Sequence, residues 1–213
     1  MRKKAVFIGN SIVAGYPWSK GKSFPSLVRR ALKGELPEIP QPAFAKNTGF
    51  DIVNKGVNGD TTRGILGRFK DDVLQQEPDM VFFLTGTNDF IYREASPEDA
   101  FANLELMAGL LDDTGSRTVY VTPVPVDAGK AGFMWMAGMG ISYDAVNRDI
   151  ERLAQLIRES GRDYVDLTAR FPDFVESVGD VDLAYMDGIH PMPDGQIFIA
   201  KQIIDFLEEV KDR

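Results

Sequence analysis

His190 is the only histidine in this sequence of 213 residues, and it is the first candidate for acid–base chemistry. A single imidazole cannot supply a metal site built from several histidines, but it can act as a general base. Asp187 stands three residues earlier, in the run Asp-Gly-Ile-His-Pro. A short turn there would let the aspartate accept the Nδ1–H of the imidazole, which fixes the tautomer and stabilises the protonated ring. The pairing is the reason to prefer a base over an incidental loop histidine.

Ser11 is the candidate nucleophile for such a base. It follows Gly9 and Asn10, directly after a short apolar run near the start of the chain. Gly9 permits a tight turn, and a serine at the start of the next segment lies where backbone N–H groups point outward. The same position suits an ordinary helix-capping serine, so position alone does not distinguish the two roles. As a catalytic group, Ser11 would be activated by His190, with Asp187 orienting the imidazole.

Acyl transfer also requires hydrogen-bond donors aimed at a developing oxyanion, and Gly59 and Asn88 are candidates for this role. Each follows a predicted strand. Gly59 would let a substrate oxygen approach its backbone N–H closely, and Asn88 offers a side-chain amide. Both residue types are also common in turns, so neither assignment stands without the other groups.

Short apolar runs alternate with amphipathic stretches and predict the elements that position these residues. The runs are apolar on both faces, as strands inside a parallel sheet are. The predicted strands are residues 5–8, 52–57, 80–84, 118–122 and 164–167. The predicted helices are residues 24–33, 62–76, 97–111, 143–160 and 196–210, with a capping box from Ser96 and Asp99 at the third. Residues 34–49 and 124–140 are expected to be irregular.

This alternation predicts the α/β class, with a three-layer α/β/α sandwich around a mostly parallel sheet. Residues 1–213 are expected to form a single domain. In open parallel sheets, ligands bind at the carboxyl ends of the strands. Ser11, Gly59 and Asn88 are therefore expected to meet at one edge of the sheet.

Four sequence blocks, in this order, resemble those that define the SGNH hydrolases, also called GDSL esterases. The blocks are Gly-Asn-Ser at residues 9–11, Asn-Lys-Gly-Val-Asn-Gly-Asp at 54–60, Gly-Thr-Asn-Asp at 86–89 and Asp-Gly-Ile-His-Pro at 187–191. Each is short, but together they span nearly the whole chain. The resemblance implies a flavodoxin-like, five-stranded sheet and a triad of Ser11, His190 and Asp187. It also implies an oxyanion hole formed by the Ser11 and Gly59 N–H groups and the Asn88 side chain, with no metal and no cofactor.

Asn10 departs from that family, which usually has an aspartate before the serine. Asparagine keeps the size and one acceptor of aspartate but loses its charge. The family's aspartate at this place is not the acid of the triad. The mechanism is therefore expected to survive, with altered local hydrogen bonding.

The predicted activity is hydrolysis of small or medium acyl esters by a serine esterase. Alternatives within the family are a carbohydrate O-acetylesterase, a lysophospholipase or an acyl-thioesterase, and a flavodoxin-like ligand-binding module is the non-enzymatic alternative. Candidate substrate-binding residues are Asn10, Trp18, Phe133, Trp135 and Met136. The last three belong to an apolar segment that suits a lid or acyl pocket, and equally a buried loop or a contact in a homo-oligomer.

The amino-acid composition limits which partners and which cellular compartment are expected. The chain has 24 basic and 32 acidic residues, and its net charge of −8 repels nucleic acid at long range. It has no cysteine, which rules out disulfides and thiolate metal sites and fits a reducing cytoplasm. No apolar run is long enough for a membrane-spanning helix, so stable membrane insertion is not expected. The expected partner is a small acyl ester in the cytoplasm, and a removed signal peptide upstream is left open.

Overall fold

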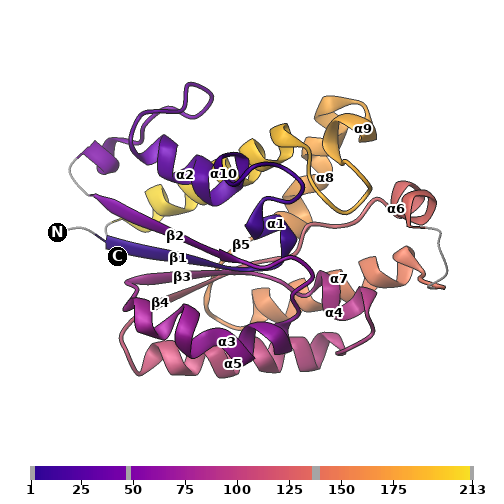
Figure 1. The fold of residues 1–213 in the computed structure, drawn as a ribbon, viewed down its shortest axis with the longest axis horizontal. Helices are drawn as coiled ribbons and strands as arrows, with labels where there is room; N and C mark the ends of the chain where they lie inside the picture. Colours follow the sequence, from indigo (N-terminus) through magenta and orange to yellow (C-terminus); the bar gives the residue numbers. More distant parts are fainter. Residues whose placement is uncertain (1–2, 47–48, 136–139, 212–213) are drawn as a thin grey trace.

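A five-stranded parallel sheet forms the centre of the molecule (Figure 1). The computed structural model describes residues 3–46, 49–135 and 140–211, and the strand count refers to these parts. The strands are β1 (Lys3–Gly9), β2 (Phe50–Gly56), β3 (Met80–Leu84), β4 (Arg117–Val121) and β5 (Asp163–Val165). Their order across the sheet is β2-β1-β3-β4-β5. This is the flavodoxin-like order, and it confirms the predicted fold class.

Apolar side chains alternate along β1 toward both faces of the sheet, so both faces need a cover of helices. On one face, Phe7 stacks on Phe82 with the ring centroids 4.5 Å apart. The helices on this face are α2 (Phe24–Leu32), α8 (Leu167–Val178) and α10 (Pro193–Glu209). The opposite face carries Val6 and Ile8. Its helices are α3 (Thr62–Asp72), α5 (Pro97–Asp112) and α7 (Tyr143–Glu159), which completes the three layers (Figure 1).

Several helices begin or end at the residues that the sequence predicts, because capping residues stand there. Ser96 Oγ accepts the Asp99 N–H at 3.1 Å, and the Asp99 carboxylate accepts the Ser96 N–H at 3.4 Å, so the predicted capping box is confirmed. After α7, Gly161 has a φ of 76°, the left-handed conformation that glycine favours at such ends. The predicted helix over residues 62–76 is shorter than expected. It ends as α3 at Asp72, and the separate 3-10 turn η3 (Leu74–Gln76) follows.

Several helices are not indicated by the sequence pattern. They are α1 (Ser11–Ala14), α4 (Thr87–Ile91), α6 (Ala128–Met134), α8 and α9 (Val181–Ala184). α6 lies in a stretch expected to be irregular, and it begins where Asp127 accepts the Lys130 N–H at 2.7 Å. Leu167 begins α8 rather than ending a strand, because Asp166 caps this helix. No helix in the described residues is both long and apolar enough to cross a bilayer.

The strand order places the start of several connections at one edge of the sheet. Ser11 follows β1, Gly59 follows β2, and Asn88 follows β3 in the first turn of α4. The connection between α9 and α10 brings Asp187 and His190 to the same edge. Because the strand order reverses between β1 and β3, this is the edge at which open parallel sheets bind ligands.

Candidate active site

Ser11 is the first residue of the short helix α1, directly after β1. A Cβ atom at Gly9 would lie 2.0 Å from the Leu84 carbonyl oxygen, so only glycine lets the chain leave the sheet here. Asn10 caps α1, because its Oδ1 accepts the Ile12 N–H at 3.0 Å. Among the described residues the Ser11 N–H donates no hydrogen bond, as is usual in the first turn of a helix. It is therefore free to bind a ligand oxygen.

His190 lies within hydrogen-bonding distance of Ser11, with 2.9 Å between Nε2 and Oγ. It is held by a narrow turn in which the Met186 N–H donates to the His190 carbonyl at 2.9 Å. Gly188 occupies this turn with a φ of 86°. A Cβ there would lie 2.3 Å from the Ala131 nitrogen, so the turn packs directly against α6. This packing places the imidazole beside a serine far away in the sequence.

Asp187 is almost completely buried and binds both the ring and the backbone of His190. Its Oδ2 lies 2.7 Å from His190 Nδ1, and its Oδ1 accepts the N–H groups of Ile189 at 3.0 Å and His190 at 2.8 Å. Burial by itself raises the pKa of this carboxyl, but these hydrogen bonds and the His190 charge outweigh burial and hold the pKa below its usual value. The carboxylate therefore stays ionised.

The three side chains form a continuous chain of hydrogen bonds. An ionised Asp187 can only accept, so it selects the tautomer with the proton on Nδ1 of His190. Nε2 then carries a lone pair directed at the Ser11 hydroxyl. Chemically, this arrangement suits transfer of the Ser11 proton to the imidazole as the serine attacks an acyl carbon.

Gly59 and Asn88 complete a set of donors around Ser11. Gly59 has a φ of 77°, and its N–H donates no hydrogen bond among the described residues. Asn88 Nδ2 donates one hydrogen to the Asp60 carbonyl at 2.9 Å, which leaves its second hydrogen for a ligand. Gly59 and Asn88 line one cavity together with Ser11 and His190. Such donors bind the negative oxygen of a tetrahedral intermediate.

The cavity has a volume of about 200 Å³ and largely aromatic walls. Tyr16 packs edge-on against His190 with ring centroids 4.7 Å apart, and Tyr92, Trp135 and Tyr143 form further parts of the wall. Burial, with a smaller contribution from the Asp187 charge, raises the pKa of Tyr143, so its hydroxyl stays protonated. Among the residues that the structure describes, the lining contains no Asp, Glu, Lys or Arg side chain. Its chemistry therefore suits an uncharged ligand.

The predicted substrate-binding residues lie in different places. Trp135 lines the cavity, while Phe133 is 74% exposed and does not line it. Trp18 also lies outside the lining, and its Nε1 donates to the Pro191 carbonyl at 3.0 Å beside the His190 turn. Asn10 is buried as the cap of α1, and Met136 falls outside the described residues.

Tyr92 and Tyr143 are cavity residues that the sequence reasoning missed. One signal for Tyr92 was available, because it stands four residues after Asn88 and so falls on the same face of a helix there. That signal depends on recognising α4, which is only five residues long. Tyr143 begins α7, and only the packing of this helix turns its ring toward the cavity.

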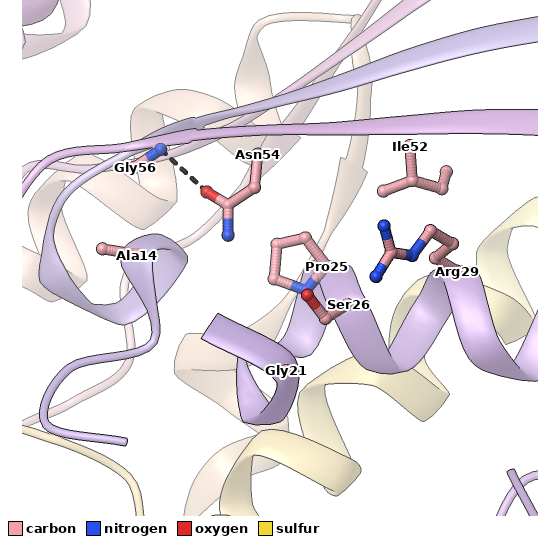
Figure 2. A pocket seen from close by; sticks show the side chains of 8 residues that line it. All are labelled: Ala14, Gly21, Pro25, Ser26, Arg29, Ile52, Asn54 and Gly56. Atoms are coloured by element: carbon pink, nitrogen blue, oxygen red, sulfur yellow. Dashed lines mark hydrogen bonds between the residues drawn. The ribbon is translucent and has the colours of Figure 1, made fainter. Parts of the chain in front are cut away.

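A second cavity, of about 300 Å³, lies beside the edge strand β2 (Figure 2). Asn54 projects into it, accepts the Gly56 N–H at 2.9 Å and donates to the Val13 carbonyl at 2.8 Å. The bond to Val13 ties β2 to α1 and thereby supports the helix that carries Ser11. The single histidine of the chain lies elsewhere, so this larger cavity is not the candidate active site.

Comparison with known proteins identifies the family. The model of the GDSL-like lipase/acylhydrolase family matches residues 7–196, which include all five candidate catalytic and oxyanion residues. The chain belongs to this family. Membership confirms both the resemblance drawn from the four sequence blocks and the predicted class, a serine hydrolase of esters.

Individual relatives align with most of the length of this GDSL-family protein. An arylesterase of Vibrio mimicus is 29% identical over 202 residues, 93% of this chain and 85% of the relative. An acetylxylan esterase of Geobacillus stearothermophilus is 24% identical over 223 residues, 98% of this chain and 94% of the relative. The solved lipase/acylhydrolase of Enterococcus faecalis superposes with a TM-score of 0.74 at 21% identity, covering 97% and 96% of the two chains. At that identity, the superposition shows a shared fold.

Proposed function

We propose that this GDSL-family hydrolase cleaves carboxylic esters of short, uncharged acyl groups, with Ser11 as the nucleophile. The observation that carries the proposal is the hydrogen-bonded chain from Ser11 Oγ through His190 to Asp187, with distances of 2.9 and 2.7 Å, at the wall of a cavity. Two relatives are an arylesterase and an acetylxylan esterase, and both enzymes hydrolyse esters.

The first half of the reaction forms an acyl-enzyme. His190 Nε2 takes the Ser11 proton as Oγ bonds to the ester carbon, and the carbonyl electrons move onto the oxygen. The N–H groups of Ser11 and Gly59 and the Asn88 amide then bind this oxyanion, and one such donor typically contributes about 3 kcal/mol. Collapse of the intermediate breaks the carbon–alkoxide bond, and the imidazolium gives its proton to the leaving alcohol.

The second half releases the acid. Water attacks the acyl-enzyme while His190 takes one of its protons, and the same donors bind the second oxyanion. Collapse returns the proton to Ser11 Oγ and frees the carboxylic acid. Asp187 stays ionised through both halves, because its pKa lies below the usual value, and it stabilises the imidazolium each time it forms.

The cavity supports a short acyl group and a flat leaving group. Its volume of about 200 Å³ is small, and its walls are aromatic and uncharged. Trp135 and Tyr92 are both lining residues and partly exposed, so their rings can contact a leaving group that extends out of the cavity. Carbohydrate O-acetylesterase is the second candidate, supported by the acetylxylan esterase relative.

A panel of p-nitrophenyl esters from acetate to decanoate, measured beside acetylated xylo-oligosaccharides, tests this function. We expect the highest kcat/KM for acetate to butyrate, and a decline of about tenfold or more by decanoate, because longer chains exceed the cavity. A higher kcat/KM for the acetylated sugars would favour the second candidate. Folded protein that hydrolyses none of these esters would contradict the function.

Trp135 is expected to limit the length of the acyl or leaving group. In Trp135→Ala, loss of the indole from the cavity wall should raise the ratio of kcat/KM for octanoate to that for acetate by about tenfold. The same ester panel measures this ratio. Phe133→Ala is the matched control, since Phe133 lies on α6, which ends directly before Trp135, is 74% exposed and does not line the cavity. Equal ratios in wild type and Trp135→Ala would remove Trp135 from the substrate site.

The proposed compartment is the cytoplasm, which suits a chain that contains no cysteine. The proposed partner is the ester substrate, with a homo-oligomer left open, and the net charge of −8 disfavours binding of nucleic acid.

A further inference from the structure

Asp89 is a buried carboxylate that takes no part in the proton transfers. It lies beside Asn88 on α4, and its side chain has no exposed surface. Its two oxygens accept the Thr62 N–H at 3.1 and 3.0 Å, and Oδ1 also accepts the Thr62 hydroxyl at 2.5 Å. Thr62 is the first residue of α3. One side chain therefore joins the start of α3 to the middle of α4.

The segment that Asp89 holds is the one that carries Gly59. Asp60, the next residue, accepts the Asn88 amide at 2.9 Å through its carbonyl. Thr61 donates its hydroxyl to Glu94 at 3.1 Å. Residues 60, 61 and 62 are thus each bound by a side chain from residues 88–94, and the bond to Asp89 is the fully buried one among them.

Capping of α3 does not by itself account for this buried charge. Thr61 already caps the helix by accepting the Gly64 N–H at 3.3 Å. No Lys or Arg pairs with Asp89 among the described residues. Burial raises the pKa of the Asp89 carboxyl above its usual value, the Thr62 bonds oppose this rise, and the Glu94 charge adds to it. A carboxylate costs free energy to bury, and Asp89 accepts one N–H of a helix start that already has a capping side chain, so it is expected to serve a further purpose.

Holding the oxyanion donors in position is such a purpose. Gly59 belongs to the loop after β2 and Asn88 to the helix after β3, so two independent segments must present their N–H groups to one oxygen. A displacement of about 1 Å in such a group can cost roughly a hundredfold in rate. Asn88 makes one bond of its own to the segment after Gly59, to the Asp60 carbonyl, and its other amide hydrogen is the oxyanion donor, so any further bond that fixes the spacing has to come from a neighbouring residue.

We propose that Asp89 is a positioning residue of the oxyanion hole, whose bonds to Thr62 hold the Gly59 loop against the helix that carries Asn88. This inference rests on the proposed function, because it assigns Asp89 a role in the same reaction. Asp89 does not touch the substrate. It acts on the rate through the separation of the two donors.

Asp89→Asn is the first test, since the amide keeps the size of the side chain but provides one acceptor oxygen instead of two. We expect kcat to fall by about 10- to 50-fold with KM within about twofold of wild type, because the donors act mainly on the transition state. The melting temperature of each variant is measured in parallel. A wild-type kcat in Asp89→Asn, at any melting temperature, would overturn the proposal.

A pair of milder substitutions at Thr62 keeps the test decisive if Asp89→Asn does not fold. Thr62→Val removes the hydroxyl that donates to Asp89 and accepts from the Asn103 amide, and it retains the shape, whereas Thr62→Ser retains the hydroxyl. We expect kcat to fall about fivefold in Thr62→Val and to return to within twofold of wild type in Thr62→Ser. Equal kcat values in the two variants would count against Asp89 as a positioning residue.

A double-mutant cycle with Asn88→Ala separates positioning from general damage. If Asp89 acts through the donors, its substitution should cost at least threefold less in the Asn88→Ala background than in wild type. The same loss in both backgrounds would overturn the proposal. Asp166→Asn is the matched control, because Asp166 caps α8 outside the cavity, where it accepts the Ala169 N–H at 3.1 Å. It should lower the melting temperature and leave kcat within twofold of wild type.

Failure of this inference can be told apart from failure of the proposed function. Ester hydrolysis by the wild-type protein, and its loss in Ser11→Ala, are measured in the same assay. If the wild type hydrolyses no ester, the function itself is wrong. If the wild type is active and Asp89→Asn matches it, only the role of Asp89 is wrong.

Discussion

Ser11→Ala is expected to lower kcat by about 10⁵- to 10⁶-fold, because Ser11 is the only hydroxyl in the described part of the chain that is hydrogen-bonded to His190 Nε2. The two N–H donors and the Asn88 amide remain, so a small acceleration over water persists. The variant should fold normally, since the substitution removes one oxygen at the edge of a cavity. Turnover of p-nitrophenyl acetate, with thermal unfolding as the test of folding, measures both outcomes.

Two controls make the Ser11 result specific. Ser177→Ala removes an exposed serine on α8 and should keep the wild-type kcat. An organophosphonate should label the wild-type protein at Ser11 and leave Ser11→Ala unlabelled. A label on a different serine, or more than about 1% of wild-type kcat in Ser11→Ala, would show that the nucleophile lies elsewhere.

His190→Ala is expected to have an effect of similar size, about 10⁵-fold or more on kcat, because the chain has no second histidine to act as the base. Without the imidazole, Ser11 stays protonated and the leaving alcohol receives no proton. The substitution also opens a space beside Ser11. Added imidazole should therefore raise the turnover of His190→Ala and have no effect on Ser11→Ala, and a rate series against imidazole concentration checks this.

Asp187→Asn is compared with His190→Ala, because it is expected to lower kcat by a smaller factor. It should reduce kcat by about 10⁴-fold, since an amide no longer enforces the tautomer with the proton on Nδ1. Its effect on stability has a definite sign. The lowered pKa of Asp187 stabilises the fold above the carboxyl's unfolded pKa, and this contribution is lost as pH falls through the folded pKa. Full activity in either variant would contradict the proposed roles.

The sequence by itself determined the sheet and the edge of the sheet at which three of the candidate site residues lie. Apolar runs buried on both faces predict parallel strands, because such strands are covered by helices on either side. The carboxyl ends of those strands share one edge, so the order of residue types along the chain is enough to place Ser11, Gly59 and Asn88 together. The four short blocks also sufficed for the family, which the match over residues 7–196 confirms.

Only the tertiary structure decided how His190 reaches Ser11. No strand rule places a residue in the connection between α9 and α10. The turn around Gly188 is set by its contact with Ala131 on α6, a helix that the sequence pattern does not indicate. Helices as short as α6 gain little from their own hydrogen bonds and form mainly through capping and packing.

The lining of the cavity was likewise decided by packing. Asn10, Trp18 and Trp135 were equal candidates in the sequence, yet Trp135 alone of these three turns into the cavity. Asn10 instead caps α1, and Trp18 bonds to the Pro191 carbonyl. The direction of a side chain depends on the element that carries it and on the neighbours that this element meets. The sequence gives the residue types and their order, whereas the walls of the cavity form only where distant segments pack together.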